Sequence, residues 1–275
     1  MLKNVTVELI FTGNELLNGR ILNTNSRYLC KKISNLGASV IRIITVPDDL
    51  ELISYNIKNS INNIPSILII SGGMGTSFDD MTLEAVSNAI KKPLLMNEKA
   101  LEYIKINYEF LKKIKLLKDF KLDDYKKKMA TLPEGSIPLY NAMGAAPGIM
   151  LECKTPQNAE TLILCLPGVP SELKSLFRTH IVRIIKEKVG GNKYIKESFF
   201  VEGFIESEIT FLSEKIMSEF NNEIWIKTFV KSPHIRKAIE FEVSSRGLEI
   251  PTKEKVKNTI RRLKEEIKKR NGKIL

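Results

Sequence analysis

The segment 71–82, SGGMGTSFDDMT, combines residues for two chemistries that oppose each other. Gly72, Gly73 and Gly75 follow an apolar run, a setting in which backbone N–H groups can close around a phosphate. Asp79 and Asp80 come directly after them, and their negative charge repels a phosphate. A divalent cation removes this conflict, because carboxylates hold ions such as Mg²⁺ that also bridge to phosphate oxygens. The segment therefore predicts a phosphate site assisted by a metal ion.

Simpler explanations exist for each part of this segment. The glycines could form a tight turn that needs positive φ, since the loop has neither the Gly-Lys-Ser/Thr of a P-loop nor the spacing of a dinucleotide-binding fingerprint. Either aspartate could cap the following helix, a role for which Thr82 competes. One cap uses one residue, so the second acid still needs another explanation.

Two further acids follow predicted strands. Asp48 comes after the run VIRIITV at 40–46, where it could instead cap the next helix. Glu15, in GNELLNG, follows the first strand, where an acid has no capping role. Together with Asp80 they are the predicted catalytic and metal-binding residues, for a divalent ion such as Mg²⁺, Mn²⁺ or Co²⁺.

The elements that carry these residues alternate between strand and helix patterns. Apolar β-rich runs at 5–13, 40–46 and 66–70 are separated by segments with helical spacing of apolar residues, such as Ile53, Ile57 and Ile61. This alternation predicts an α/β fold with a mostly parallel sheet between helices, in three layers. Ligands of such sheets collect at the carboxyl ends of the strands, where Gly13 and Asp48 lie.

The rest of the chain predicts a second domain. Residues 98–128 have a lysine-rich helical pattern, 131–168 contain short strands, and a helix is expected from 171 to 188. The GGN at 190–192 is expected to be a hinge. The pattern beyond it indicates a small α+β domain, with strands at 194–203, 223–230 and 236–244 and helices at 206–219 and 252–270. We expect the aromatic residues of this domain, Trp225 included, to lie in its core. The predicted domains are 1–188 and 192–275.

Composition excludes several classes of protein. Cys30, Cys153 and Cys165 lack C-x-x-C spacing, which argues against a disulfide framework, and two histidines exclude a His-rich metal centre. The short apolar runs and the absence of a signal-peptide pattern predict a cytoplasmic protein without a membrane partner. The net charge of +11 lies in residues 91–128 and 251–275, which we interpret as solvated helix faces and not as a specific nucleic-acid site.

Five motifs, in this order, resemble the CinA family. They are GNELLNGRILNTNSRYLCKKISNLG, VPDD, SGGMGTSFDDMTLEAV, KKKMATLPEGSIPLYNAMGAAPG and LPGVPSEL, and they span about residues 5–176. The N-terminal domain of that family is similar to the molybdopterin-binding fold of MogA and the gephyrin E domain. GFIESEI at 203–209 resembles part of the family's second domain. Because the sequence ends at Leu275, we expect no C-terminal nicotinamide-mononucleotide amidase activity.

The resemblance implies roles for the candidate residues. The loop 72–76 corresponds to one that holds phosphate in molybdopterin enzymes, and Asp48 and Asp80 correspond to residues that handle metal or nucleotide. In CinA-type proteins the same site is similar to one that hydrolyses ADP-ribose with a divalent metal. Met74 and Ser77 depart from the usual residues, which bears on substrate choice. The resemblance also implies a homodimer.

Two glycine-proline motifs, MGAAPG (143–148) and LPGVPSEL (166–173), could be rigid turns. The resemblance instead implies that they lie near the first site, where they could hold a second phosphate or a nucleoside. Lys128, just before MATLPEG, is the best-placed cation of its run, although it could also be a solvated lysine. The predicted phosphate- or nucleotide-binding residues are Gly72, Gly73, Gly75, Thr76, Lys128, Gly144, Ala146, Pro147, Gly148, Gly168 and Ser171.

Three functions are consistent with these residues and with the resemblance. The leading one is metal-dependent hydrolysis of a nucleotide pyrophosphate such as ADP-ribose or FAD. The second is a molybdopterin-binding or adenylyltransferase-type protein of molybdenum cofactor biosynthesis, which needs the same phosphate loop. The third is a module that binds a dinucleotide without catalysis, against which the set Glu15, Asp48 and Asp80 argues.

Overall fold

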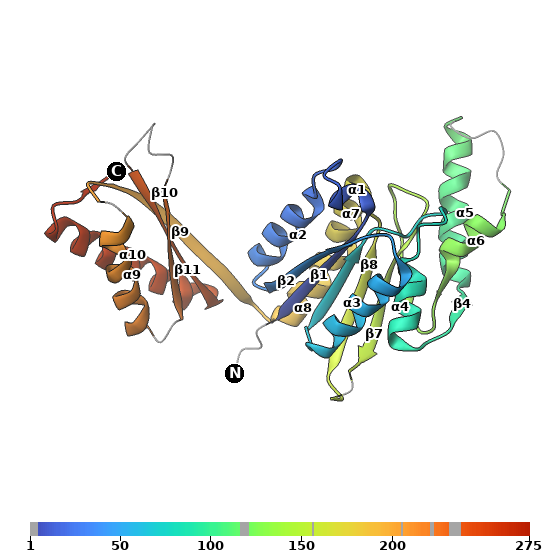
Figure 1. Ribbon diagram of the computed structural model, residues 1–275, viewed down its shortest axis with the longest axis horizontal. Coiled ribbons are helices and arrows are strands. Elements are labelled where there is room, and N and C mark those ends of the chain that lie inside the picture. Colours follow the sequence, from blue (N-terminus) through green and yellow to red (C-terminus); the bar gives the residue numbers. More distant parts are fainter. Residues whose placement is uncertain (1–4, 116–120, 156, 205, 221–222, 231–237) are drawn as a thin grey trace. The chain divides into compact units, whose positions relative to one another are not determined.

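The computed structural model describes residues 5–115, 121–155, 157–204, 206–220, 223–230 and 238–275 (Figure 1). The chain divides into two compact units. The larger unit contains residues 5–33 and 39–188, and the smaller unit contains residues 34–38 and 189–275. No helix in the described ranges is long and apolar enough to cross a membrane.

A six-stranded sheet forms the centre of the larger unit, in the order β2-β1-β3-β8-β7-β6. The parallel strands are β2 (Ser39–Val46), β1 (Thr6–Thr12), β3 (Ile67–Ser71) and β8 (Glu160–Leu166); β7 (Gly148–Lys154) and β6 (Ile137–Leu139) follow in antiparallel order. Every residue of β3 is buried, as expected for a parallel strand that is covered on both faces. The predicted α/β fold with a mostly parallel sheet is confirmed.

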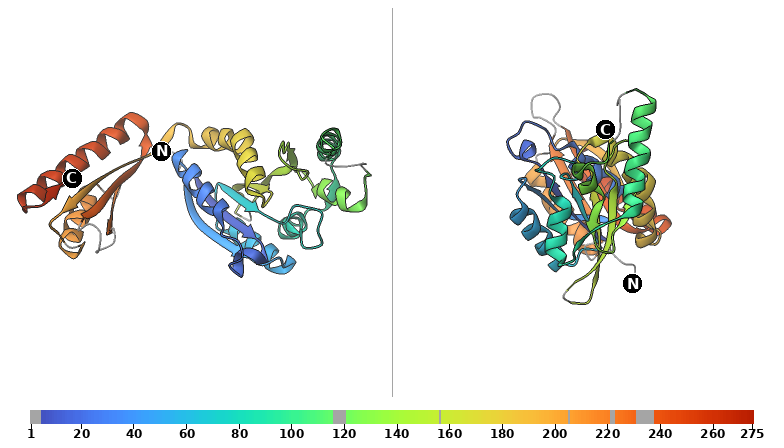
Figure 2. Two further views of the ribbon diagram at one scale, coloured as in Figure 1. Left: turned by 90° about the horizontal axis from the view of Figure 1, so that it is seen from above. Right: turned by 90° about the vertical axis from the view of Figure 1, so that its right-hand side faces the viewer.

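Helices cover both faces of this sheet (Figures 1 and 2). They are α1 (Asn14–Leu17), α2 (Thr24–Asn35), α3 (Leu50–Asn62), α4 (Thr82–Ile90), α7 (Pro170–Leu176) and α8 (Val182–Val189). Ile10 of β1 lies in one buried cluster with Ile53 of α3 and Val86 of α4. Tyr28 of α2 meets Phe177, in the π-helical turn between α7 and α8, edge-on at a centroid distance of 5.8 Å.

The lysine-rich segment after α4 forms two helices, not the single helical stretch that its pattern predicts. These are α5 (Glu98–Lys113) and α6 (Asp124–Ala130), and residues 116–120 between them lie outside the described ranges. Lys115 has a φ of 59°, which is incompatible with continuing α5. The flanking strands β4 (Leu94–Met96) and β5 (Thr131–Pro133), which are too short to give a clear strand pattern, pair with each other in antiparallel order.

The smaller unit is a four-stranded antiparallel sheet with two helices. Its elements are β9 (Asn192–Glu202), α9 (Glu206–Glu219), β10 (Ile224–Val230), β11 (Ala238–Leu248), α10 (Glu249–Lys269) and β12 (Lys273–Ile274), and the strand order is β10-β11-β9-β12. Residue 205 of GFIESEI and residues 231–237 lie outside the described ranges.

The prediction that Trp225 lies in the core of this unit is wrong. Its side chain is 62% exposed, because alternate residues of a strand point to opposite faces and the neighbours Ile224 and Ile226 take the buried face. β10 is also an edge strand of its sheet, so Trp225 has a neighbouring strand, β11, on one side only.

Candidate functional site

A cavity of about 590 Å³ lies at the carboxyl ends of the parallel strands. Its walls come from the loops after four strands, namely Gly13 after β1, Asp48 after β2, residues 72–76 after β3 and residues 167–170 after β8. Parallel strands end at one edge of their sheet, so residues far apart in sequence meet there. The loops that the sequence pattern places at strand ends therefore line one cavity.

The glycine loop, residues 72–76, leaves four of its backbone donors unused, while Gly72 N donates to Leu166 O at 3.0 Å. Gly72 and Gly73 have φ values of 115° and 60°, and a Cβ atom at Gly72 would lie 2.4 Å from Thr12 Oγ1. Thr82 fixes the loop: its Oγ1 donates to Gly72 O at 2.8 Å and its N–H to Gly73 O at 3.0 Å. Within the described residues, the N–H groups of residues 73–76 donate to no other group. These amides are available to an anion.

Neither Asp79 nor Asp80 caps helix α4. The N-cap residue is Met81, which forms no side-chain cap hydrogen bond. Instead, Asp80 Oδ2 accepts a hydrogen bond from Ser77 N at 2.8 Å. A Cβ atom at Gly75 would lie 2.6 Å from the same oxygen, so the carboxylate sits directly against the glycine loop. The capping explanation for these two acids is removed.

Asp48 does not cap helix α3. Asp49 is the N-cap of α3, and its Oδ1 accepts from Leu52 N at 2.8 Å. Asp48 lines the cavity, where its Oδ2 accepts from Asn14 N at 2.9 Å. Burial raises the pKa of Asp48, the Asn14 N–H opposes this shift, and the negative charges of nearby carboxylates raise the pKa further. Negative charge is thus crowded on this wall.

The carboxylates on this wall do not form a closed metal cage. Glu15, Asp48 and Asp80 all line the cavity, but in the part of the chain that the structure describes no three His, Cys, Asp or Glu side chains are close enough to hold a metal ion together. Mg²⁺ is usually held by one or two carboxylates while phosphates and water complete its shell. The crowded carboxylates beside free amides fit an ion that binds together with a phosphate ligand.

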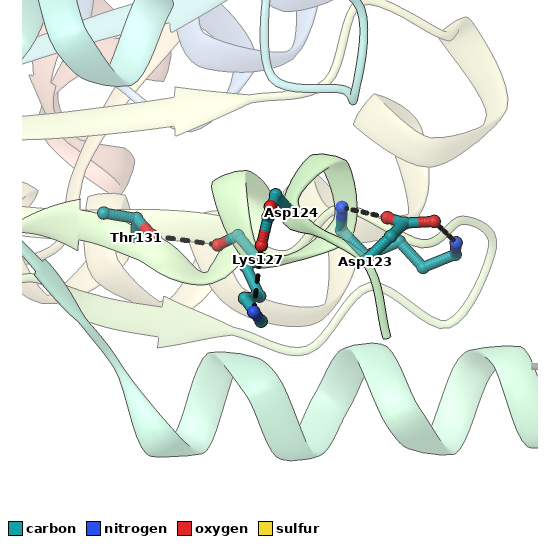
Figure 3. A network of polar contacts seen from close by, with 5 residues as sticks. Asp123, Asp124, Lys127 and Thr131 are labelled. Atoms are coloured by element: carbon teal, nitrogen blue, oxygen red, sulfur yellow. Dashed lines mark hydrogen bonds and ion pairs between the residues drawn. The ribbon is translucent and has the colours of Figure 1, made fainter. Parts of the chain in front are cut away.

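Lys128 does not line the first cavity but a second one, of about 330 Å³. The glycine loop and Asp80 line both cavities, whereas Glu15 and Asp48 line only the first. Lys128 Nζ donates to Ser77 O at 2.6 Å, so the lysine holds the residue that follows the glycine loop. Figure 3 shows the polar contacts of α6: Asp123 caps its first turn, and Thr131 Oγ1 donates to Lys127 O at 2.9 Å at its end.

The other predicted binding residues divide into two groups. Ala146 and Gly168 line the first cavity, as do the loop residues Gly72, Gly73, Gly75 and Thr76. Outside its lining lie Gly144, Pro147, Gly148 and Ser171. Gly148 begins β7, and Ser171 is exposed on α7.

Among the polar residues that line the cavity, Asn25 and Glu172 were not predicted, and neither was Asn141, which lies outside the lining and bonds to Glu172. Asn25 Nδ2 donates to Gly168 O at 2.7 Å, and Asn141 Nδ2 donates to Glu172 Oε2 at 2.7 Å. Burial raises the pKa of Glu172, and the hydrogen bond from Asn141 opposes this shift. Glu172 lies within LPGVPSEL, so an acid beside a turn at a strand end was the available signal.

The sequence matches the family described as "Probable molybdopterin binding domain" over residues 8–187, which include every cavity residue named above. Protein PF0476 of Pyrococcus furiosus is 39% identical over 254 residues, which is 88% of this chain and 97% of that protein. A protein of Sulfurisphaera tokodaii is 33% identical over 270 residues, covering 98% of this chain and 97% of that protein.

A solved structure also resembles the chain. It is the CinA protein of Thermoplasma acidophilum, a protein described as having unknown function. It is 31% identical, with a TM-score of 0.56, and the match covers 66% of this chain and 98% of that one.

Proposed function

Because the chain belongs to the family of probable molybdopterin binding domains and is CinA-like, we propose that its cavity binds a molybdopterin-type ligand. Such a ligand is a pterin that carries a phosphate, and the proposed reaction is adenylyl transfer in molybdenum cofactor biosynthesis. A phosphate oxygen of the pterin attacks the α-phosphorus of ATP; the new P–O–P bond forms as pyrophosphate leaves.

The observation that carries this proposal is the set of unused N–H groups at residues 73–76. These amides bind the phosphate of the ligand, and the glycines allow the backbone to approach it. Asp48 and Asp80, which line the same cavity, would hold a divalent ion. The ion would supply positive charge that offsets the repulsion between the phosphates and these carboxylates.

The second candidate is hydrolysis of a nucleotide pyrophosphate such as ADP-ribose or FAD. Its support is the crowding of four acids, Glu15, Asp48, Asp79 and Asp80, on one cavity wall. For this reaction the loop amides would hold one phosphate, and the acids would hold an ion that stabilises charge on the other. The family match favours the molybdopterin ligand over this candidate.

A panel of reactions separates the candidates. The purified protein is incubated with ATP and anaerobically released molybdopterin, and separately with ADP-ribose, FAD or NAD, each with Mg²⁺, Mn²⁺ or Co²⁺. Adenylylated pterin with release of pyrophosphate supports the first candidate, and AMP from ADP-ribose supports the second. If every ligand binds and none reacts, both reactions are refuted in favour of a binding module.

The proposal also includes a homodimer in the cytoplasm without a specific nucleic-acid partner. Family resemblance supports the dimer, and sedimentation equilibrium tests it. A single species with the mass of one chain, at all concentrations, would contradict it.

A further inference from the structure

Glu172 is a carboxylate with a fixed orientation at the wall of the first cavity. Asn141 Nδ2 donates to its Oε2, and the same nitrogen donates to Ala146 O at 2.8 Å. Asn141 is fully buried, and its Oδ1 accepts from Met143 N at 3.1 Å, so this amide cannot rotate without losing bonds. Within the described residues, Oε1 of Glu172 accepts from no group. A half-buried acceptor without a donor is costly unless a ligand or water supplies one.

The loop beside Glu172 is held in place from α5. Asn107 Nδ2 donates to Asn141 O at 2.9 Å and to Gly144 O at 2.8 Å. Tyr140 Oη donates to Asn107 Oδ1 at 3.0 Å, which fixes that amide in turn. A Cβ atom at Gly144 would lie 2.1 Å from Glu172 Oε2, so the loop passes directly over the carboxylate. These contacts position Glu172 before any ligand binds.

Asn25 offers a second acceptor at this cavity. Its Nδ2 donates to Gly168 O, which leaves the Oδ1 of the amide as an acceptor. The residue is 8% exposed, lines the cavity, and has no donor for Oδ1 in the described part of the chain. Asn25 of α2 bonds to Gly168, and Glu172 lies four residues further along the chain, in α7. This region of the cavity needs hydrogen-bond donors, whereas the glycine loop needs acceptors.

Apolar side chains border the same cavity. Ile21, Leu22 and Val169 line it, and all three are exposed, with Leu22 82% exposed. Exposed apolar groups gathered at a cavity indicate a ligand with an apolar face. A flat ring can occupy such a cavity, because its faces contact the aliphatic side chains while its edge forms hydrogen bonds with the polar ones.

We propose that Glu172 and Asn25 form a ring subsite that selects a 2-amino-4-oxo heterocycle, as found in pterins and guanine, over adenine. Such a ring presents two adjacent N–H donors, which match a carboxylate in a paired arrangement. Oε1 of Glu172 offers one acceptor, and Oε2, which already accepts from Asn141, offers its second lone pair. The Watson–Crick edge of adenine presents one amino donor next to an acceptor, which repels a carboxylate. This inference rests on the proposed function, because it assigns the ring of the ligand whose phosphate binds the glycine loop.

Equilibrium binding of mononucleotides to the wild-type protein provides a test that needs no variant. GMP has both donors, IMP lacks the 2-amino group, and AMP lacks the paired donors. We expect affinity to fall in the order GMP, IMP, AMP, with about ten- to hundredfold between the first and the last. The affinity for neopterin monophosphate is measured beside the affinity for GMP. Tenfold tighter binding of neopterin monophosphate indicates a pterin ligand, and tenfold tighter binding of GMP indicates a guanine nucleotide.

Glu172→Gln then tests the residue itself. It should lose at least about tenfold in affinity for GMP and neopterin monophosphate, while AMP binding stays within twofold. Glu152→Gln, an exposed acid on β7 outside both cavities, is the matched control. Equal wild-type affinity for GMP and AMP would overturn the ring subsite while the phosphate loop stands. Absence of binding by all ligands and by pyrophosphate would overturn the proposed function as well.

Discussion

Gly75→Ala should change the position of the Asp80 carboxylate without changing its charge. Gly75 does not have a positive φ, so alanine fits the backbone. Its Cβ would lie 2.6 Å from Asp80 Oδ2 and 3.2 Å from Cγ, and these nearest atoms belong to a side chain that can rotate. The carboxylate therefore swings away from Ser77 N and from the glycine loop. We expect metal-dependent affinity for a phosphate ligand to fall at least tenfold, or about 1.4 kcal/mol.

The same substitution should change stability little. The lost hydrogen bond from Ser77 N to Asp80, which lies in an exposed loop, costs about 0.5–1.5 kcal/mol. Alanine restricts the unfolded chain and returns about 0.4–1 kcal/mol. Since these terms nearly cancel, the melting temperature should stay within about 4 °C of the wild type.

Isothermal titration with ADP-ribose and with ATP, with and without Mg²⁺, measures the effect. Ser77→Ala is the matched control, because it changes the same loop and keeps the backbone N–H that Asp80 accepts. Wild-type affinity and metal dependence in Gly75→Ala would refute the role assigned to Asp80. A fall in melting temperature of more than about 10 °C would refute the assumption that only the side chain moves.

Four other predictions follow from the site. Asp80→Asn should fold normally, since its amide oxygen can still accept from Ser77 N, and should lose most metal-dependent activity; retained activity with lower stability would indicate a structural role. Gly73→Ala should be destabilised by about 2–4 kcal/mol, because its backbone is left-handed and its Cβ would lie 2.5 Å from Thr82 Oγ1; a urea titration measures this loss. The raised pKa of folded Asp48 means that its stabilising contribution is present below the unfolded pKa and is lost as pH rises through the folded pKa. Thermal melts should therefore show Asp48→Asn at or above wild-type stability at pH 7, with the difference closing toward pH 4; a less stable variant at pH 7 contradicts this. Oligonucleotide binding should disappear with modest salt while ADP-ribose binding with metal persists, and micromolar, sequence-selective oligonucleotide binding above physiological salt would contradict the interpretation of the basic helices.

Local pattern determined the parallel half of the larger unit. The apolar runs at 5–13, 40–46 and 66–70 became β1, β2 and β3, and the helical spacing between the last two became α3. The glycine loop was also recognisable, because positive φ and close backbone approach are properties of single residues. Since parallel strands end at one edge, these local features were enough to place the cavity.

Helix caps show where the sequence left alternatives open. Asp48 and Asp49 are adjacent and chemically identical, so pattern alone could not say which one caps α3. The fold assigns Asp49 to the cap and bonds Asp48 to Asn14 N, which is 34 positions away in sequence. Because α3 has Asp49 as its N-cap, Asp49 bonds to the helix and the residue before it, Asp48, lines the cavity.

Only the tertiary structure decided the roles of Lys128, Glu172 and Trp225. Lys128 bonds to a carbonyl 51 positions away, and Glu172 is oriented by an amide 31 positions away. Trp225 is exposed because the helices pack against the opposite face of its sheet. Residue type limits what each side chain can bond to, but burial and partner depend on which distant segment packs against it, and no local pattern contains that information.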